Sequence, residues 1–152
     1  MINRYTYSLP IGFIEIEDNS REIIGIHITD NFNNDCLPTE ISEKAYTELK
    51  EYFEGKRKRF DFPIKAEGTE FQMKVWKALT EIPYGETISY GELAKRIGNT
   101  KASRAVGGAN NKNPIMIVIP CHRVIGANGS LVGYAGGIEI KKRLLELEKK
   151  YK

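Results

Sequence analysis

Apolar and polar positions alternate along the first 65 residues, and a period of two predicts β-strands. The alternation is clearest over Gly12–Glu17, and the preceding Arg4–Leu9 continues it on the other side of Pro10-Ile11. A third strand is predicted over Glu22–Thr29, beyond the turn-forming residues 18–20. Together the three segments predict a small antiparallel meander.

One helix is predicted to follow the meander, after a polar loop over Asn31–Thr39. Ser42 is a favourable N-cap and Gly55 is a typical helix stop. The basic run Lys56–Arg59 is interpreted as a solvated loop, and Phe60–Glu67 as a linker. Apolar residues recur at helical spacing and predict one buried helix face, made of Ala45, Leu49, Tyr52 and Phe53.

The second half of the chain has a period near 3.6 and clear helix boundaries. Capping boxes at Thr69–Gln72 and Ser89–Glu92 each predict a helix start. After the turn Gly98–Thr100 a further helix is predicted over Lys101–Asn110, and this order is that of a helix-turn-helix. Its second helix is rich in Ala and Gly, which suits close approach to DNA or to a packed helix. A last helix is predicted over Ile138–Tyr151, with Ile140, Leu144 and Leu147 buried and Lys141, Lys142 and Arg143 outside.

These patterns predict an α/β protein with a small sheet-plus-helix domain over residues 1–65 and a mainly helical domain over residues 66–152. The chain of 152 residues is long enough to bury cores of this size. No apolar stretch approaches the ~20 residues of a membrane helix, and the start has no signal-peptide core, so a soluble, cytoplasmic protein is expected. Two cysteines exclude a disulfide-dense scaffold, and the Cys and His spacing predicts no metal site.

Charge is distributed unevenly about a net value of +3. Residues 1–65 carry 9 basic and 12 acidic side chains, whereas residues 66–152 carry 14 basic and 8 acidic ones. Around the predicted helix-turn-helix, from Thr87 to Arg123, Glu92 is the one acidic residue. A positive field of this kind suits a polyanion such as DNA.

Cys121 stands at the end of a predicted buried apolar strand, Ile115–Ile119, and is followed by His122 and Arg123. Nearby positive charge or a base raises the thiolate fraction of a cysteine, so this setting favours a reactive nucleophile over a packed thiol. Adjacent side chains point apart in an extended segment, so His122 is expected to reach the thiol only through a water or a bend.

A third group is needed to orient the His122 imidazole. Glu148 and Glu146 on the last predicted helix are the candidates. If the nucleophile lies beside a DNA-binding helix-turn-helix, its substrate is carried by DNA, and a base inside a duplex has to be flipped out to react. Arg104 has the length and charge to fill the gap that a flipped base leaves.

Several motifs that stand in order along residues 67–150 resemble those of the O6-alkylguanine-DNA alkyltransferases, also called methylated-DNA–protein-cysteine methyltransferases. The acceptor block Pro120-Cys121-His122-Arg123-Val124 is the most specific of them. The others are Thr87–Tyr90 with Leu93, Arg104–Ala109, Asn113-Pro114 and Tyr134–Gly137.

The resemblance implies a direct-reversal DNA repair protein. It implies that the protein binds double-stranded DNA, flips out O6-alkylguanine and transfers the alkyl group irreversibly to Cys121, once per protein and without a cofactor. The fold it implies is a ribonuclease-H-like N-terminal domain and a winged-helix-like C-terminal domain, in a protein expected to be a monomer.

The resemblance also implies roles for single residues. His122 would act as a base through a water, with Glu148 orienting it and Asn113 bracing the active-site turn. Tyr90 would reach the guanine, and Arg104 would replace the flipped base. Further DNA contacts are implied for Ala102, Ser103, Ala105, Gly107 and Arg123, and the substrate pocket for Val124, Tyr134, Ala135 and Gly136.

Two departures from the family pattern border the implied alkyl pocket. Ala135 stands where many members have serine, and Asn110 replaces a larger apolar residue. They bear on the size of the alkyl group accepted and leave the reaction itself unchanged.

Two other functions compete with alkyl transfer. A non-catalytic helix-turn-helix module would read base edges with its second helix, but Lys101–Ala109 offers mostly Ala, Gly and Val. A Cys-His hydrolase would turn over many substrates per protein. The simpler alternatives for single residues are an exposed Glu148 paired with Lys152, a surface Tyr90, a phosphate-binding Arg104 and a plain turn at Asn113.

Overall fold

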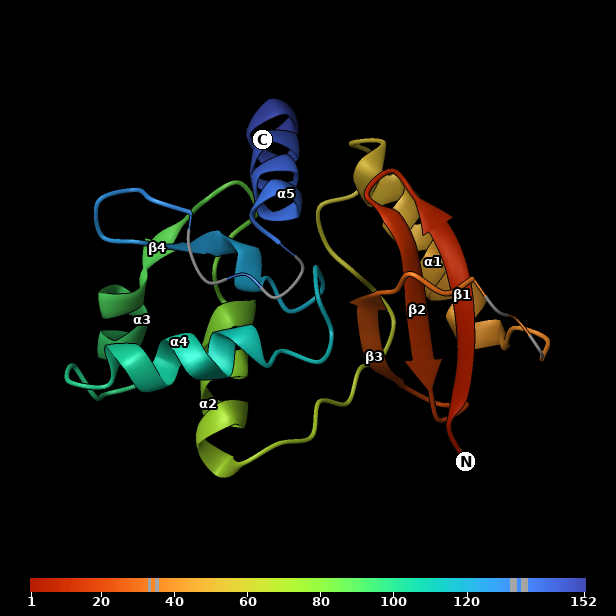
Figure 1. The fold of residues 1–152 in the computed structure, drawn as a ribbon, viewed down its shortest axis with the longest axis horizontal. Coiled ribbons are helices and arrows are strands. Elements are labelled where there is room, and N and C mark those ends of the chain that lie inside the picture. The colour runs from red at the N-terminus through yellow and green to blue at the C-terminus, as the bar shows by residue number, and fades with distance from the viewer. Residues whose placement is uncertain (33, 35, 132–133, 135–136) are drawn as a thin grey trace. The chain divides into compact units, whose positions relative to one another are not determined.

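The computed structural model describes residues 1–152 except 33, 35, 132–133 and 135–136 (Figure 1). The chain divides into two units. The first comprises Met1–Glu67 and Pro114–Met116, and the second comprises Gly68–Asn113 and Ile117–Lys152. Among the described residues, no helix is long and apolar enough to cross a membrane.

The first unit is built on an antiparallel sheet, as the period-two pattern predicts. Strands β1 (Asn3–Leu9), β2 (Gly12–Asp18) and β3 (Ile23–Ile28) follow one another in the order β1-β2-β3. The inward side chains Ile14 and Ile16 are fully buried, and helix α1 covers that face of the sheet (Figure 1).

Helix α1 spans Glu40–Phe53, and its N-cap lies three residues before the predicted one. Thr39 is the N-cap, and Ser42 is the third helical residue, whose hydroxyl closes a capping box with Thr39. The Thr39 hydroxyl also donates to buried Asp18 at 2.8 Å, which anchors the helix start to β2. Gly55 ends the helix as predicted, with a φ of 76° and its N–H bonded to the Tyr52 carbonyl.

Two segments cover the outer edge of β3, and the sequence analysis does not predict that either of them pairs with it. Ile64 pairs in parallel with Ile23, so part of the predicted linker extends the sheet. Farther along the strand, the Ile26 N–H donates to Pro114 and its carbonyl accepts from Met116. Both segments satisfy backbone groups that an edge strand would otherwise expose.

The second unit contains the predicted helices. Helix α2 (Glu70–Thr80) begins at the predicted capping box, with Thr69 as N-cap. The short strands β4 (Ile88–Ser89) and β5 (Val124–Ile125) pair in parallel. Helix α3 (Tyr90–Arg96) starts at Ser89, the predicted cap, although the Glu92 carboxylate bonds to Arg96 rather than closing a box.

The predicted helix-turn-helix is formed by α3 and α4 (Ser103–Asn111). Gly98 in the turn has a φ of 81°, a conformation that favours glycine. Val106 and Ala109 of α4 are buried, and the Trp76 indole of α2 donates to the Ala109 carbonyl at 2.8 Å. One side of the small-residue helix therefore serves packing, while its N-terminal turn is exposed.

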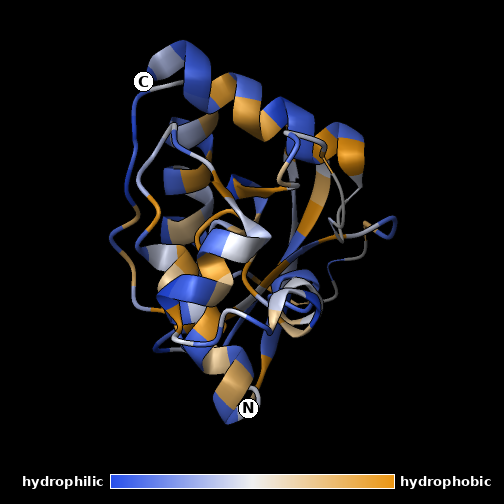
Figure 2. Ribbon diagram, turned by 90° about the vertical axis from the view of Figure 1, so that its left-hand side faces the viewer, coloured by the Kyte–Doolittle hydropathy of each residue, from blue (hydrophilic) through white to orange (hydrophobic). Residues whose placement is uncertain are grey.

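Helix α5 spans Ile138–Tyr151, as predicted, but its buried face differs from the expected one. Its alternation of polar and apolar residues is visible in Figure 2. Leu144 is fully buried, whereas Ile140 and Leu147 are only half-buried. Lys141, predicted to lie outside, is fully buried.

The apolar run before the cysteine is buried but irregular rather than a strand. Ile115 bonds to the sheet of the first unit, and Ile117 turns the chain with a φ of 74°. Cys121–Arg123 then forms a single 3-10 turn, η1, instead of an extended segment. The side-chain geometry expected for an extended Cys121-His122 pair therefore does not apply.

The Thr39 cap should make a measurable contribution to stability. We expect Thr39→Ala to lower the free energy of unfolding by about 1–2 kcal/mol, because it removes the cap and the donor to buried Asp18. Urea unfolding followed by circular dichroism measures the change. Thr47→Ala, on an exposed position of the same helix, is the matched control and should change stability little; equal losses in the two variants would contradict the capping role.

Candidate active site

Cys121 occupies the first position of the turn η1 and is 5% exposed. Its N–H donates to the Ile119 carbonyl, and its own carbonyl accepts from the Val124 N–H and, at 3.4 Å, from the Asn110 amide. Burial raises the pKa of the Cys121 thiol, and the side chains of Asn113, Lys141 and Tyr134 act in the opposite direction. The thiol is thus held in a nearly closed site by groups that favour its ionised form.

Asn113 braces the segment that leads to the cysteine. Its side-chain amide donates to the Ile119 carbonyl at 2.7 Å, across the irregular turn around Ile117. This is the place and contact that the resemblance implies. A plain turn at Asn113-Pro114 would not need that bond.

His122 and Glu148 are in direct contact inside the protein. The His122 Nε2 lies 2.6 Å from Glu148 Oε2, and the two side chains are 0% and 1% exposed. The alternative of an exposed Glu148 paired with Lys152 is therefore wrong. Glu146, the other candidate, is exposed.

The protonation of this pair follows from its surroundings. Burial by itself raises the pKa of Glu148, but hydrogen bonds and charges from His122 and Arg123 hold it well below its usual range. The carboxylate is therefore ionised, and the His122 Nε2–H donates to it. That leaves His122 Nδ1 as an acceptor, buried and without a hydrogen-bond partner among the described residues.

Arg123, for which the resemblance implies a DNA contact, is buried and bonded inside the second unit. The side chain is buried, at 7% exposure. Its Nε and Nη2 donate to the two oxygens of Glu148 at 2.8 and 2.9 Å, and its Nη1 donates to the Ile82 carbonyl at 2.7 Å. Its positive charge is paired with Glu148 inside the second unit.

Lys141 lies in the site, although the sequence pattern predicts it on the outer face of the last helix. Its ammonium donates to the Val124 carbonyl at 2.5 Å and lies 5.9 Å from the centroid of the Tyr90 ring. Burial lowers the pKa of Lys141, and the Cys121 thiolate opposes that shift. One signal would have found it, because Lys141 shares a helix face with Leu144 and Glu148 at spacings of three and seven.

Two tyrosines lie near the thiol. Burial first, and then the charge of Cys121, raise the pKa of both Tyr90 and Tyr134. Gly107 of α4 faces the Tyr90 ring, since a Cβ built there would lie 3.9 Å from it. The remaining predicted pocket residues, Ala135 and Gly136, lie outside the described residues.

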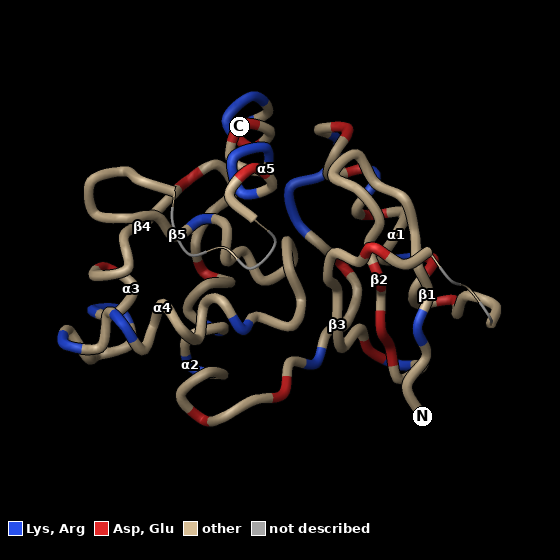
Figure 3. Tube along the Cα trace, in the orientation of Figure 1, with Lys and Arg blue, Asp and Glu red and all other residues tan. Residues whose placement is uncertain are grey.

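The predicted DNA-binding residues lie at the start of α4. Ser103, Arg104 and Ala105 are exposed, and Ala102 and Gly107 are partly exposed. The exposed basic residues Lys95, Arg96 and Lys101 accompany them, and Figure 3 shows the basic segments around the turn between α3 and α4. This surface has the charge and the small side chains that close approach to a polyanion requires.

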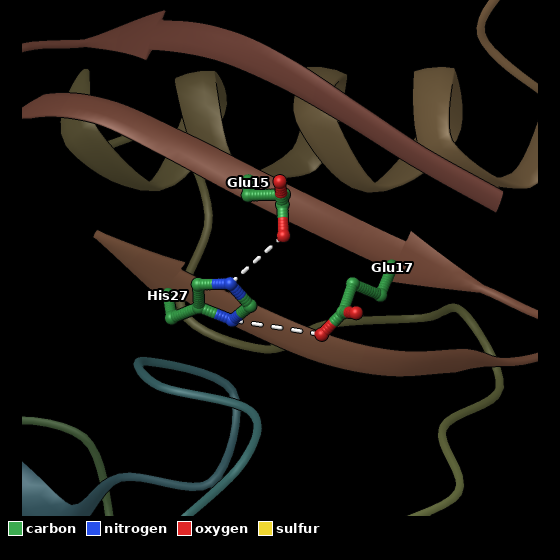
Figure 4. Close-up of side chains that lie close together, drawn as sticks. All are labelled: Glu15, Glu17 and His27. Atoms are coloured by element: carbon green, nitrogen blue, oxygen red, sulfur yellow. Dashed lines mark hydrogen bonds and ion pairs between the residues drawn. The ribbon is translucent and has the colours of Figure 1, made fainter. Parts of the chain in front are cut away.

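A second cluster of titratable side chains lies on the sheet of the first unit (Figure 4). His27 faces Glu15 from its Nε2 at 3.0 Å and Glu17 from its Nδ1 at 3.7 Å, and Glu17 also pairs with Arg4. His27 of β3 thus bridges two carboxylates of β2, and one ligand atom from each of the three side chains lies within 4.8 Å of the others.

Comparison with known proteins covers both units. Residues 2–66 match the family model described as 6-O-methylguanine DNA methyltransferase, ribonuclease-like domain, and residues 70–150 match the corresponding DNA binding domain.

Relatives of known name agree with the family models. The methylated-DNA–protein-cysteine methyltransferase of Methanosarcina barkeri is 58% identical over 145 residues, which cover 91% of this chain and 92% of the relative. That of Methanosarcina acetivorans is 63% identical over 109 residues, covering 72% and 70%. Among solved structures, Mycobacterium tuberculosis O6-methylguanine methyltransferase superposes with a TM-score of 0.91 at 43% identity, covering 100% of this chain and 95% of that one. The same organism's OGT in complex with DNA gives 0.88 at 44% identity, covering 97% and 93%.

The buried histidine should make stability depend on pH. Burial lowers the pKa of folded His122 from the ordinary histidine value of about 6.5, so below that pH the unfolded chain binds a proton that the folded chain does not. We expect the free energy of unfolding to fall by about 1.4 kcal/mol per pH unit below pH 6.5, with the Glu148 contribution adding to the loss below about pH 4.5. Urea titrations between pH 5 and 8 measure the slope.

The chain provides a control for this slope in its other histidine. His27→Gln should keep the slope, since His27 is exposed, whereas His122→Gln should flatten it between pH 5 and 6.5. A slope that follows His27 would contradict the assignment.

Proposed function

The chain belongs to the 6-O-methylguanine DNA methyltransferase family, and from that membership we propose that it repairs DNA by moving the alkyl group of O6-alkylguanine onto its own Cys121. The observation that carries the proposal is the buried thiol of Cys121, which stands beside a His122–Glu148 pair in the same unit as an exposed, basic helix-turn-helix. The names of the relatives and the DNA complex of the M. tuberculosis protein support it.

DNA binding begins, in this proposal, at the exposed start of α4. The small residues 102, 103, 105 and 107 let the helix backbone approach the duplex, and the neighbouring basic side chains contact phosphates. Arg104 enters the stack in place of the extruded guanine, which pays for part of the unstacking. The partner is double-stranded DNA that carries O6-alkylguanine, bound by a monomer in the cytoplasm.

The transfer step balances without a cofactor. In this scheme a water carries the thiol proton to His122 Nδ1, the buried ring nitrogen that has no hydrogen-bond partner among the described residues. The sulfur then bonds to the alkyl carbon, the bond from that carbon to O6 breaks, and its electron pair stays with the guanine. The proton lost by the thiol ends on the guanine, so the products are a thioether at Cys121 and a normal base.

The residues around the thiol have matching roles in this scheme. Tyr90 donates a hydrogen bond to the guanine as charge develops on it. Lys141 stabilises the thiolate and, by donating to the Val124 carbonyl, fixes the strand that follows the turn. The second lone pair of that carbonyl remains to accept from the guanine amino group.

The acceptor role of Cys121 is tested by mass spectrometry. When the protein is mixed with a duplex that contains one O6-methylguanine, we expect one added methylene that maps to Cys121 and saturates at one per protein. Cys121→Ser should abolish the transfer and leave DNA binding largely intact, because the thiol lies inside the protein. Cys36→Ser, which alters an exposed thiol, is the matched control and should react normally.

The two competing functions give other results in that experiment. A Cys-His hydrolase would release product beyond one equivalent, and a non-catalytic module would bind the duplex with no change in mass. Either result would overturn the proposal.

The role of Arg104 is tested by comparing repair with binding. We expect Arg104→Ala to slow methyl transfer on the order of tenfold or more, because flipping loses its support, while affinity for an undamaged duplex changes much less. Lys101→Ala, at a neighbouring exposed residue, should instead weaken duplex binding and lower the salt dependence by about one ion. Equal losses of repair and affinity in Arg104→Ala would make it a phosphate contact only.

A further inference from the structure

The Arg123 side chain is bound by several groups of the second unit. It donates to both oxygens of Glu148 and to the Ile82 carbonyl, and its guanidinium lies 5.7 Å from the centroid of the Tyr84 ring. Within the described part of the chain, its charged partner is Glu148, the same carboxylate that binds His122.

Glu148 therefore binds both the Arg123 guanidinium and the His122 imidazole with one negative charge. A carboxylate that faced the imidazole alone would favour the protonated, cationic ring. A guanidinium stays charged at any ordinary pH. Its positive charge compensates the negative charge of the carboxylate, and its two parallel hydrogen bonds fix the carboxylate's orientation. The carboxylate therefore still accepts a hydrogen bond from His122 Nε2–H, but it favours the addition of a second proton at Nδ1 less strongly.

The other charged groups around the pair act in the same direction or are neutral. Lys141 from α5 adds a further positive charge that disfavours the imidazolium. Tyr84, from the segment after α2, is raised in pKa by burial and stays neutral. The Gly85 N–H donates to Glu148 Oε1 at 3.1 Å, and this also stabilises the carboxylate. Cys121, from the turn itself, is the group whose proton is to be removed.

We propose that Arg123 is a positioning residue which, through Glu148, keeps His122 neutral and free to accept a proton at Nδ1. Its bond to Ile82 fixes the guanidinium, and the paired bonds to both oxygens of Glu148 orient the carboxylate, whose Oε2 also accepts from the imidazole. The catalytic use of this neutral base rests on the proposed function, whereas the protonation state itself does not.

The protonation state is measured directly by NMR titration of the imidazole ring signals. The chain has two histidines, so exposed His27 serves as an internal reference in every spectrum. In the wild type we expect His122 to stay neutral to the lowest pH at which the protein is folded. In Arg123→Met, His122 should titrate at a pH higher than in the wild type by about one unit or more, because the Glu148 charge is no longer compensated.

Arg123→Lys separates charge from geometry and guards against a failure of Arg123→Met to fold. It retains one positive charge without the paired hydrogen bonds, so His122 should titrate between its positions in the other two proteins. Arg57→Met is the matched control, since Arg57 pairs with buried Glu48 in the first unit and should leave the His122 curve unchanged even if it lowers stability. An unshifted His122 in folded Arg123→Met or Arg123→Lys would overturn the proposal.

The rate of methyl transfer as a function of pH tests the link to function. In Arg123→Met the acid limb of the single-turnover rate should move to higher pH in step with the His122 titration, and a purely structural role would scale the rate equally at every pH. If the ring titrations shift as expected but the wild type transfers no methyl group, the proposed function fails and the inference about Arg123 stands. A uniform loss of rate without a shift of the limb overturns the use of Arg123 in catalysis.

Discussion

The buried carboxylate of Glu148 is the interaction on which the second unit depends. It comes from α5 and binds His122 and Arg123 of the turn η1, while Arg123 reaches Ile82 and the carboxylate accepts from Gly85 after α2. A buried ion pair offers little net stability over an apolar packing of the same volume, but removal of one partner leaves an uncompensated charge. The network is therefore best understood as a device that fixes where three segments meet.

The acceptor thiol presents the opposite problem, because the burial that shields it also disfavours its ionised form. The residues that offset this come from separate elements: Asn113 before the turn, Tyr134 after it and Lys141 on α5. His122 contributes from the other direction, as an acceptor rather than as a charge. In the proposed function the site divides two tasks, since Lys141 lowers the pKa of the thiol and the His122–Glu148 pair receives the proton.

Local signals in the sequence predicted the elements well, because capping boxes, glycine stops and period-two alternation act within a few residues. The meander, α2 and the bounds of α5 were predicted on this basis. The N-cap of α1 is Thr39 rather than the predicted Ser42, and both residues belong to one capping box. Long-range contacts were harder. The DNA contact expected for Arg123 shows this, since nothing local indicates a carboxylate 25 residues away. Lys141 was placed outside because a lysine is rarely buried, although its helix face argued otherwise.

The strand β3 also has a consequence for the order in which the chain acquires its structure. Its outer edge is completed by residues 63–65 and then by Pro114–Met116, which the ribosome delivers after the whole of the helix-turn-helix. A nascent chain that stops short of Met116 holds β3 with free backbone groups on that edge. The sheet of the N-terminal unit therefore gains its last edge hydrogen bonds only from the stretch of chain that leads into Cys121.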